Sequence, residues 1–374
     1  MLPLELFQKE LPAVQSLLQE LVEIESPSTD KAAVDHLGGR IRRELQALDG
    51  ALEVLPQAQV GDQVLSRWGA GPDGILFLCH MDTVFDLGTL TARPFRAVDG
   101  RLEGPGVQDM KSGIAMLLSV LRLLKQHGQW PKRPLAALFT SDEETGSQAS
   151  RALIEAEARR AGLVLCLEPA LANGALKTSR KGTGDIELRV KGMASHAGVD
   201  HAGGRNAIEE LAYHILEAQQ LTEYSRGTTV NVGVISGGTR PNVVPDEAQA
   251  WIDFRVQAGE EYDRLDRWVK GLAPRIPGTR LSASITLNRP PMPRDDTMIR
   301  TFQRAREIGR ALGLDLMEGA TGGGSDANFV APLGVPVLDG LGAVGDGAHS
   351  DHEYILAQSL AERSALLAAL LLMW

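Results

Sequence analysis

The stretch 75-ILFLCHMDTV-84 joins a continuous apolar run to a polar His-Met-Asp sequence. Successive apolar residues, without the alternation of a half-exposed strand, indicate a strand that is buried on both faces. His80 and Asp82 follow at i and i+2, so their side chains point to the same side of an extended chain. A buried strand has little use for two such groups, whereas a metal ion binds a neutral imidazole that a carboxylate can orient. The stretch therefore predicts a covered sheet with a functional group where one strand ends.

More strands and helices of the same kind surround this stretch. Apolar strand-like runs occur at 135-LAALFT-140 and 163-LVLCL-167. Apolar residues at helical spacing occur at 4–23, in a second segment that ends at about Leu48, and in 111-KSGIAMLLSVLRLLKQHG-128. Apolar strands that alternate with helices are typical of an α/β fold with a largely parallel central sheet.

The pattern changes after about residue 178. The segment 182-GTGDIELRVKG-192 alternates apolar and polar residues, which is typical of a strand with one exposed face. It is followed by a helix, two strands, a second helix and a last strand, at 203–221, 229–237, 248–256, 260–273 and 280–288. This β-α-β-β-α-β order is that of a ferredoxin-like α+β unit. We therefore expect a larger α/β domain of residues 1–178 and 289–374, interrupted by an inserted domain of residues 179–288.

Composition excludes several classes of function. The 374 residues carry a formal net charge of −10 and contain no run of lysine and arginine. Nucleic acids and anionic membrane surfaces are therefore not expected as partners. No signal peptide and no stretch of 18 apolar residues is apparent, so we expect a cytoplasmic protein. Cys79 and Cys166 lie in apolar runs and are expected to be reduced core residues.

Residues that bind metals recur where the strands end and in glycine-rich turns. The carboxyl ends of parallel strands meet at one edge of a sheet. We therefore expect a cluster at this edge, made of His80, Asp109 in 104-GPGVQDMKSG-113, Glu143 and Glu144 in 140-TSDEETGS-147, Glu168, and His349 in 345-GDGAHSDHEY-354. Imidazoles and carboxylates without thiolates suit zinc, with manganese or cobalt as substitutes.

This set suits two metal ions better than one. Asp109 can bridge them, with His80 and Glu168 on one ion and Glu144 and His349 on the other. Each ion then keeps a coordination position open to water. A metal pair lowers the pKa of that water and polarises the carbonyl of a substrate. Glu143 is placed to accept the proton of that water, and Asp82 to fix the tautomer of His80.

Each motif also has a reading without catalysis. An Asp-Glu-Glu run often begins a helix, Glu168 before Pro169 can simply end a strand, and His349 can be a surface histidine. The 104-GPG-106 turn lacks the full dinucleotide fingerprint, and 321-TGGGSDA-327 can form a phosphate-binding nest. The shared placement of the motifs at strand ends favours the metal site.

In their order along the chain, the motifs resemble those of the co-catalytic zinc amidohydrolases. They are 80-HMDTV-84, 104-GPGVQDMKSG-113, 141-SDEETGS-147, 167-LEP-169, 194-ASHAG-198, 241-PNVVPDEA-248, 321-TGGGSDA-327 and 348-AHSDHEY-354. That family comprises glutamate carboxypeptidases, acetylornithine and succinyl-diaminopimelate deacylases, aminoacylases, and di- and tripeptidases. With 287-LNRPPM-292 and 341-LGAVGDGAHSDHEY-354, the chain is most similar to the glutamate carboxypeptidase branch, which removes C-terminal glutamate from folates and other acyl-glutamates.

The resemblance implies a zinc-peptidase-like catalytic domain that holds two Zn²⁺ ions, with Mn²⁺ or Co²⁺ as possible replacements. It implies Glu143 as the general base, Asp82 as the support of His80, and a cis peptide bond after Asp109. The ligands that it implies are His80, Asp109 as the bridge, Glu144, Glu168 and His349. Gln108 stands where the family usually has a small residue, and we expect it to alter the rim of the site.

The resemblance also assigns a role to the insert. His196 in ASHAG and Asn242 in PNVVP are similar to residues that reach the metal site of a partner subunit, where the histidine stabilises the oxyanion. The insert is then a dimerisation domain and the protein a homodimer. Arg289 resembles the arginine that binds the α-carboxylate of the substrate, beside the backbone N–H groups of Gly322, Gly323 and Gly324. Arg255 and Lys177 are further candidates for substrate binding, although Arg255 can equally form a salt bridge with a nearby acid.

We therefore expect a two-zinc metallo-carboxypeptidase that releases a C-terminal amino acid, with glutamate as the candidate, from a small peptide, a folate or an N-acyl amino acid. One alternative is a deacylase of the acetylornithine or succinyl-diaminopimelate type, or an aminoacylase or dipeptidase. An alternative of another class is a catalytically silent metal-binding relative. Glu143 and the five ligands argue against silence, because such a relative has no need of a base.

Overall fold

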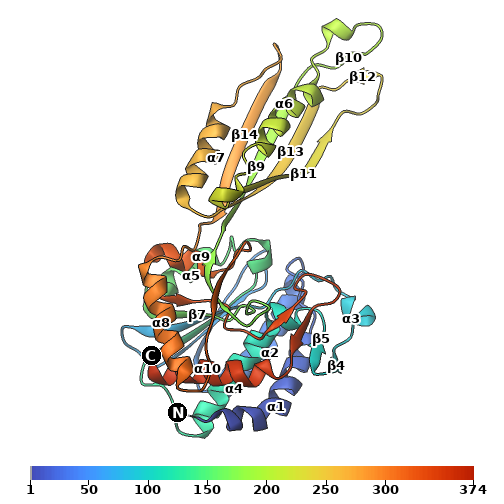
Figure 1. The fold of residues 1–374 in the computed structure, drawn as a ribbon. Helices are drawn as coiled ribbons and strands as arrows, with labels where there is room; N and C mark the ends of the chain where they lie inside the picture. The colour runs from blue at the N-terminus through green and yellow to red at the C-terminus, as the bar shows by residue number, and fades with distance from the viewer. Residues whose placement is uncertain (1) are drawn as a thin grey trace. The chain divides into compact units, whose positions relative to one another are not determined.

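The computed structural model describes residues 2–374, and the chain divides into two compact units (Figure 1). The first unit comprises Met1–Ser179, Arg294–Ala320 and Ser325–Trp374. The second comprises Arg180–Pro293 together with the short loop Thr321–Gly324. Each unit has its own hydrophobic core, so each is described by itself.

A six-stranded, mainly parallel sheet forms the centre of the first unit. Its order is β1 (Ala51–Leu55), β2 (Gln63–Trp68), β6 (Leu135–Thr140), β3 (Gly74–His80), β7 (Ala161–Cys166) and β16 (Val337–Leu338). The four strands from β6 to β16 run parallel to one another, whereas β2 pairs antiparallel with both β6 and β1 at one edge. The largely parallel sheet expected from the sequence is confirmed; β1 and β2 were not expected.

Strand β3 explains how the sheet positions a site. All of its residues after Gly74 are buried, because both faces of the sheet are covered. In the register with β6, His80 lies beside Thr140, and in the register with β7, Leu78 lies beside Cys166. The three strands therefore end close together, and the residues that follow them meet at one edge.

Eight helices belong to the described part of the first unit. Among them, α1, α4 and α10 pack against one another and bury a large share of the core. Asp30 begins α2 by accepting a hydrogen bond from the backbone N–H of Ala33 at 3.0 Å. The helices are α1 (Leu4–Val22), α2 (Lys31–Ala47), α3 (Thr89–Ala92), α4 (Ser112–Gln126), α5 (Arg151–Ala158), α8 (Asp296–Arg310), α9 (Ala327–Val330) and α10 (Ser359–Met373).

Short strands hold the loops around the site. A small sheet has the order β17 (Gly345–Asp346), β18 (Tyr354–Leu356), β5 (Arg101–Glu103) and β4 (Arg96–Val98). In it, Tyr354 of β18 pairs with Glu103 of β5, which brings the segment before β18 next to the segment after β5. A further pair is formed by β8 (Leu176–Arg180) and β15 (Glu318–Thr321).

The second unit has the ferredoxin-like order that the sequence predicts. Its antiparallel sheet runs β11 (Thr229–Gly237), β13 (Glu247–Val256), β9 (Gly182–Lys191) and β14 (Arg280–Arg289), with helices α6 (Ala207–Gln219) and α7 (Gly259–Gly271). Alternate residues of β13 are buried, and side chains such as Ile252 and Phe254 pack in the core of this unit. A separate strand pair, β10 (Ser195–His196) and β12 (Val243–Val244), completes the unit.

Two expectations from composition can be compared with the structure. Cys79 and Cys166 are both buried and form no disulfide, as expected. Burial also raises the pKa of the Cys79 thiol, which keeps it protonated. Among residues 2–374, the structure contains no helix with the length and apolar character needed to cross a bilayer.

Candidate active site

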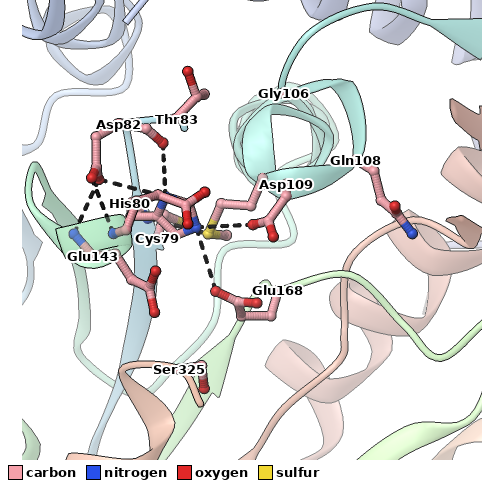
Figure 2. A network of polar contacts seen from close by, with 12 residues as sticks. Cys79, His80, Asp82, Thr83, Gly106, Gln108, Asp109, Glu143, Glu168 and Ser325 are labelled. Carbon is pink, nitrogen blue, oxygen red and sulfur yellow. Dashed lines mark hydrogen bonds and ion pairs between the residues drawn. The ribbon is translucent and has the colours of Figure 1, made fainter. Parts of the chain in front are cut away.

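Four of the predicted metal ligands are brought together by the ends of the central strands and the turns after them. His80 ends β3, and its Nε2 atom lies 3.0 Å from Oδ1 of Asp109 and 3.4 Å from Oε1 of Glu168 (Figure 2). Asp109 lies in the turn Val107–Lys111 before α4, and the Asp109–Met110 bond is cis, as the resemblance implied. Glu144 belongs to the same cluster, with a carboxylate oxygen within 4.8 Å of ligand atoms of His80 and Asp109.

The fifth predicted ligand, His349, lies on the other side of Asp109. Its Nε2 atom is 3.4 Å from Oδ2 of Asp109 and 3.1 Å from Oε2 of Glu144. Asp109 therefore presents one oxygen to each of the two imidazoles. The side chain of His349 is 50% exposed, whereas that of His80 is 2% exposed, so solvent has access on the side of His349.

Glu143 is placed beside the cluster. It begins the short turn Glu143–Thr145 that follows β6. Ligand atoms of Glu143, His80 and Glu168 all lie within 4.8 Å of one another, and Glu143 is 9% exposed. A carboxylate at this distance has the reach to exchange a proton with a water molecule held by the same cluster.

Asp82 contacts His80 and also holds the turn that follows β6. Nδ1 of His80 lies 3.0 Å from the backbone oxygen of Asp82 and 3.6 Å from its carboxylate, so the main chain makes the shorter contact. The carboxylate also accepts hydrogen bonds from the backbone N–H groups of Glu143 at 3.2 Å and Glu144 at 3.1 Å. The hydroxyl of Ser28 donates to it at 2.7 Å. Asp82 thus holds the turn that carries both glutamates.

The carboxylates perturb the two imidazoles strongly. Burial lowers the pKa of His80, but hydrogen bonds to Asp109, Asp82 and Glu168 outweigh it and raise that pKa well above its usual value. Hydrogen bonds to Asp109 and Glu144 raise the pKa of His349 to about 11. For Asp109, burial raises the pKa, but the hydrogen bonds from His349 and His80 lower it below its usual range. The carboxylates therefore favour positive charge at two places, the imidazole of His80 and the imidazole of His349.

The donor set fits divalent metal ions. Two imidazoles and several carboxylates converge without a thiolate, which suits zinc, manganese or cobalt. Among residues 2–374, no group donates a hydrogen bond to the buried Oε1 atom of Glu144. A buried carboxylate oxygen without a partner is costly, and a cation satisfies it.

The residues implied for the partner's site lie in the second unit. His196 is exposed at the end of β10. This strand pairs with β12, which begins directly after Asn242. Nδ1 of His196 accepts hydrogen bonds from the backbone N–H groups of Gly198 and Val199, both at 3.1 Å. Because Nδ1 is an acceptor, the neutral ring carries its proton on Nε2, where it can be donated outward.

The expected carboxylate-binding residues also lie in the second unit. Arg289 is buried at the end of β14, and a Cβ on Gly324 would lie 2.7 Å from its Cδ atom. Arg180, which sequence reasoning missed, donates from Nη1 to the backbone oxygens of Gly323 at 3.2 Å and Gly324 at 2.9 Å. The glycine-rich loop is thus packed between two buried arginines.

Three other positions differ from expectation or stay open. Arg255 donates hydrogen bonds to both carboxylate oxygens of Asp253, at 3.0 and 2.8 Å. The salt bridge that was the alternative to substrate binding by Arg255 is therefore present. Lys177 is a buried residue of β8 in the first unit. The side chain of Gln108 is 5% exposed and points away from His80 (Figure 2), and its expected effect on the rim of the site stays a prediction.

Glu353 is a further residue that the sequence did not single out. It lies in the quoted 348-AHSDHEY-354 motif, but nothing in the motif indicates its contacts. Its carboxylate accepts hydrogen bonds from the backbone N–H groups of Gly106, Gln108 and Asp109. Burial and the charge of Asp109 raise the pKa of Glu353 to about 7, against these three hydrogen bonds.

Comparisons with known proteins agree with this geometry. Residues 76–373 match the model of peptidase family M20/M25/M40. Carboxypeptidase G2 of Pseudomonas sp. (strain RS-16) is 32% identical over 97% of this chain and 89% of its own length. The acetylornithine deacetylase of Edwardsiella ictaluri is 28% identical over 69% of this chain and 71% of its own.

A solved structure shows the same fold. Aminopeptidase PepT of Bacillus cereus superposes with a TM-score of 0.77 at 22% identity, over 96% of this chain and 98% of its own. Its likeness supports the two-unit architecture, while the match of the family model extends over most of the chain, from β3 to the last helix. This chain is therefore a member of peptidase family M20/M25/M40, a metallopeptidase-type hydrolase.

Proposed function

We propose that this metallopeptidase is a two-zinc carboxypeptidase that hydrolyses the amide bond to a C-terminal amino acid, with glutamate as the preferred residue. The observation that carries the proposal is the arrangement around Asp109, whose two oxygens lie 3.0 Å from His80 and 3.4 Å from His349. An imidazole on each side of one carboxylate suits a bridged pair of ions better than a single ion.

In this proposal His80 and Glu168 would hold one ion, His349 and Glu144 would hold the other, and Asp109 would contribute to both sites. When bound, such ions lower the pKa of a water molecule and polarise the carbonyl of the substrate. Glu143 takes the proton of the attacking water and delivers it to the nitrogen of the leaving amino acid. The amide C–N bond breaks as that nitrogen receives the proton. Asp82 keeps Glu143 and Glu144 in place through their backbone N–H groups.

Recognition of the C-terminal residue is assigned to Arg289. A guanidinium binds a carboxylate with two parallel hydrogen bonds, which selects substrates with a free α-carboxylate. The similarity to carboxypeptidase G2 over 97% of the chain supports this choice of substrate. The preference for glutamate and the role of Lys177 in it stay predictions.

The second unit is proposed to form a homodimer and to supply His196 to the site of the partner subunit. The outward Nε2–H of His196 suits a donor to the oxyanion of the tetrahedral intermediate. Asn242 adjoins it, since its backbone oxygen accepts from Ala197 at 3.0 Å. Mixing inactive His196→Ala with inactive Glu143→Ala chains tests the exchange, because only mixed dimers regain an intact site. Confirmed mixed dimers without activity would contradict it.

A substrate panel tests the activity itself. Acyl-glutamates and folates, N-acetylornithine and dipeptides are each assayed with Zn²⁺, Mn²⁺ and Co²⁺. The proposal predicts the highest kcat/KM for acyl-glutamates. Highest kcat/KM on N-acetylornithine would favour the deacylase alternative, which the 28% identity to acetylornithine deacetylase supports. Metal binding without turnover on the whole panel would favour a silent relative.

A further inference from the structure

Glu353 is fully buried, at 0% exposure, between the loop that carries His349 and strand β18. Its Oε2 atom accepts a hydrogen bond from the backbone N–H of Gly106 at 2.9 Å. Its Oε1 atom accepts from Gln108 at 2.8 Å and from Asp109 at 3.0 Å. One carboxylate therefore binds three main-chain donors of a turn more than 240 residues earlier in the chain.

The turn that it binds needs such an acceptor. N–H groups at the start of a helix have no partner within the helix. Here the backbone also departs from helical geometry, with φ −112° and ψ 98° at Asp109 and φ −127° and ψ 36° at Met110. Gly106 has φ +72°, and a Cβ there would lie 2.7 Å from Cγ2 of Thr83, so the main chain passes close to its neighbours. Regular helical bonding thus cannot fix the direction of Asp109.

The fold places Glu353 where its carboxylate can fix the direction of Asp109. The pairing of β18 with β5 brings the residue before Tyr354 next to the segment that begins the turn. Buried Lys111, whose ammonium donates to the backbone oxygen of Ile24 at 2.8 Å, interacts electrostatically with the Glu353 carboxylate. Because His349 precedes Glu353 by four residues, a single side chain connects the loop of one imidazole with the turn of Asp109.

We propose that Glu353 is a positioning residue that locks the Gly106–Asp109 turn to the His349 loop, so that Asp109 presents its two carboxylate oxygens to two metal ions. The inference rests on the proposed function, because it explains how the bridging ligand is aimed. It assigns no chemical step to Glu353. A carboxylate that only stabilised the fold would leave the geometry of the metal ligands unchanged when it is replaced.

The test compares E353Q with D351N and the wild type. E353Q keeps the shape but places an NH₂ group against backbone donors, whereas Asp351, two residues earlier, has a side chain that is 96% exposed. Two properties are measured on the full-length protein. They are the hydrogen exchange of the Gly106, Gln108 and Asp109 amides without metal, and the affinity and visible spectrum of Co²⁺ titrated against a chelator.

In E353Q we expect at least tenfold faster exchange of the three amides, weaker binding of at least one Co²⁺ by roughly 10- to 100-fold, and an altered Co²⁺ spectrum. D351N is expected to behave like the wild type. Wild-type exchange, or a wild-type Co²⁺ spectrum and affinity with only a lower melting temperature, would overturn the inference. If E353Q does not fold, E353D, which keeps the charge but has a shorter side chain, is judged by the same criteria. A wild type that bound no cobalt would contradict the proposed function, while the exchange rates would still decide the role of Glu353.

Discussion

Replacing Asp82 by alanine tests whether the carboxylate that follows β3 holds the turn of Glu143 and Glu144. The side chain is buried and accepts three hydrogen bonds, from Ser28, Glu143 and Glu144. The hydroxyl of Ser28 also donates to the backbone oxygen of Thr83 at 3.3 Å, so it keeps an acceptor when Asp82 is replaced. Two backbone N–H groups then lose their partner. Each buried unsatisfied group costs roughly 1–3 kcal/mol, so Asp82→Ala should lower the free energy of unfolding by roughly 2–6 kcal/mol.

Calorimetry and metal analysis together measure this effect. For a unit of this size 1 kcal/mol corresponds to roughly 2–4 °C, so the melting temperature of the metal-free protein should fall by roughly 4–24 °C. Metal affinity should fall as well, because Glu144 moves with its backbone. Asp86→Ala, at an exposed position four residues later, is the matched control and should change neither property. A variant of Asp82 with a wild-type melting temperature and metal content would refute the reasoning.

The remaining predictions concern the base, the protons and the substrate. Glu143→Gln should keep the wild-type metal content and lose roughly 10²–10⁴-fold in kcat, because only proton transfer is removed; an unchanged kcat in steady-state assays would exclude the role. Without metal, His349 has its pKa raised to about 11 and is protonated at neutral pH, so metal binding must release its proton. Apparent affinity in chelator competition should therefore rise with pH, by up to roughly tenfold per unit and proton, and an affinity independent of pH between 6 and 8 would contradict this. Arg289→Met should raise KM for acyl-glutamates by roughly 10- to 100-fold but leave the corresponding α-amides unaffected, and equal effects on both would remove Arg289 from carboxylate recognition.

The sequence predicted the elements whose patterns are strong. The apolar run of β3 and the alternation of β9 and β13 reflect burial on two faces and on one face, and both patterns are visible in the residues themselves. Strand β2 escaped prediction because its buried positions include Gln63 and Ser66, which do not read as a core strand. Strand β1 has no fully buried residue and thus no clear pattern.

The same distinction applies to the site. His80, Glu143 and Glu168 were found because they follow strands whose ends meet, which topology alone dictates. Side chains that bind backbone groups left no such signal. Nothing in the order of residues indicates that the carboxylate of Asp82 binds the turn after β6, or that Glu353 binds a turn far earlier in the chain. These contacts depend on main-chain directions that only the folded structure defines.

The number and position of the bound ions test the proposed two-metal centre most directly. Crystals of the protein grown with zinc and measured on both sides of the zinc absorption edge would give anomalous peaks at each metal. We predict two peaks, one beside His80 and Glu168 and one beside His349 and Glu144, with Asp109 in contact with both. A single peak, or zinc bound away from Asp109, would contradict the two-metal centre.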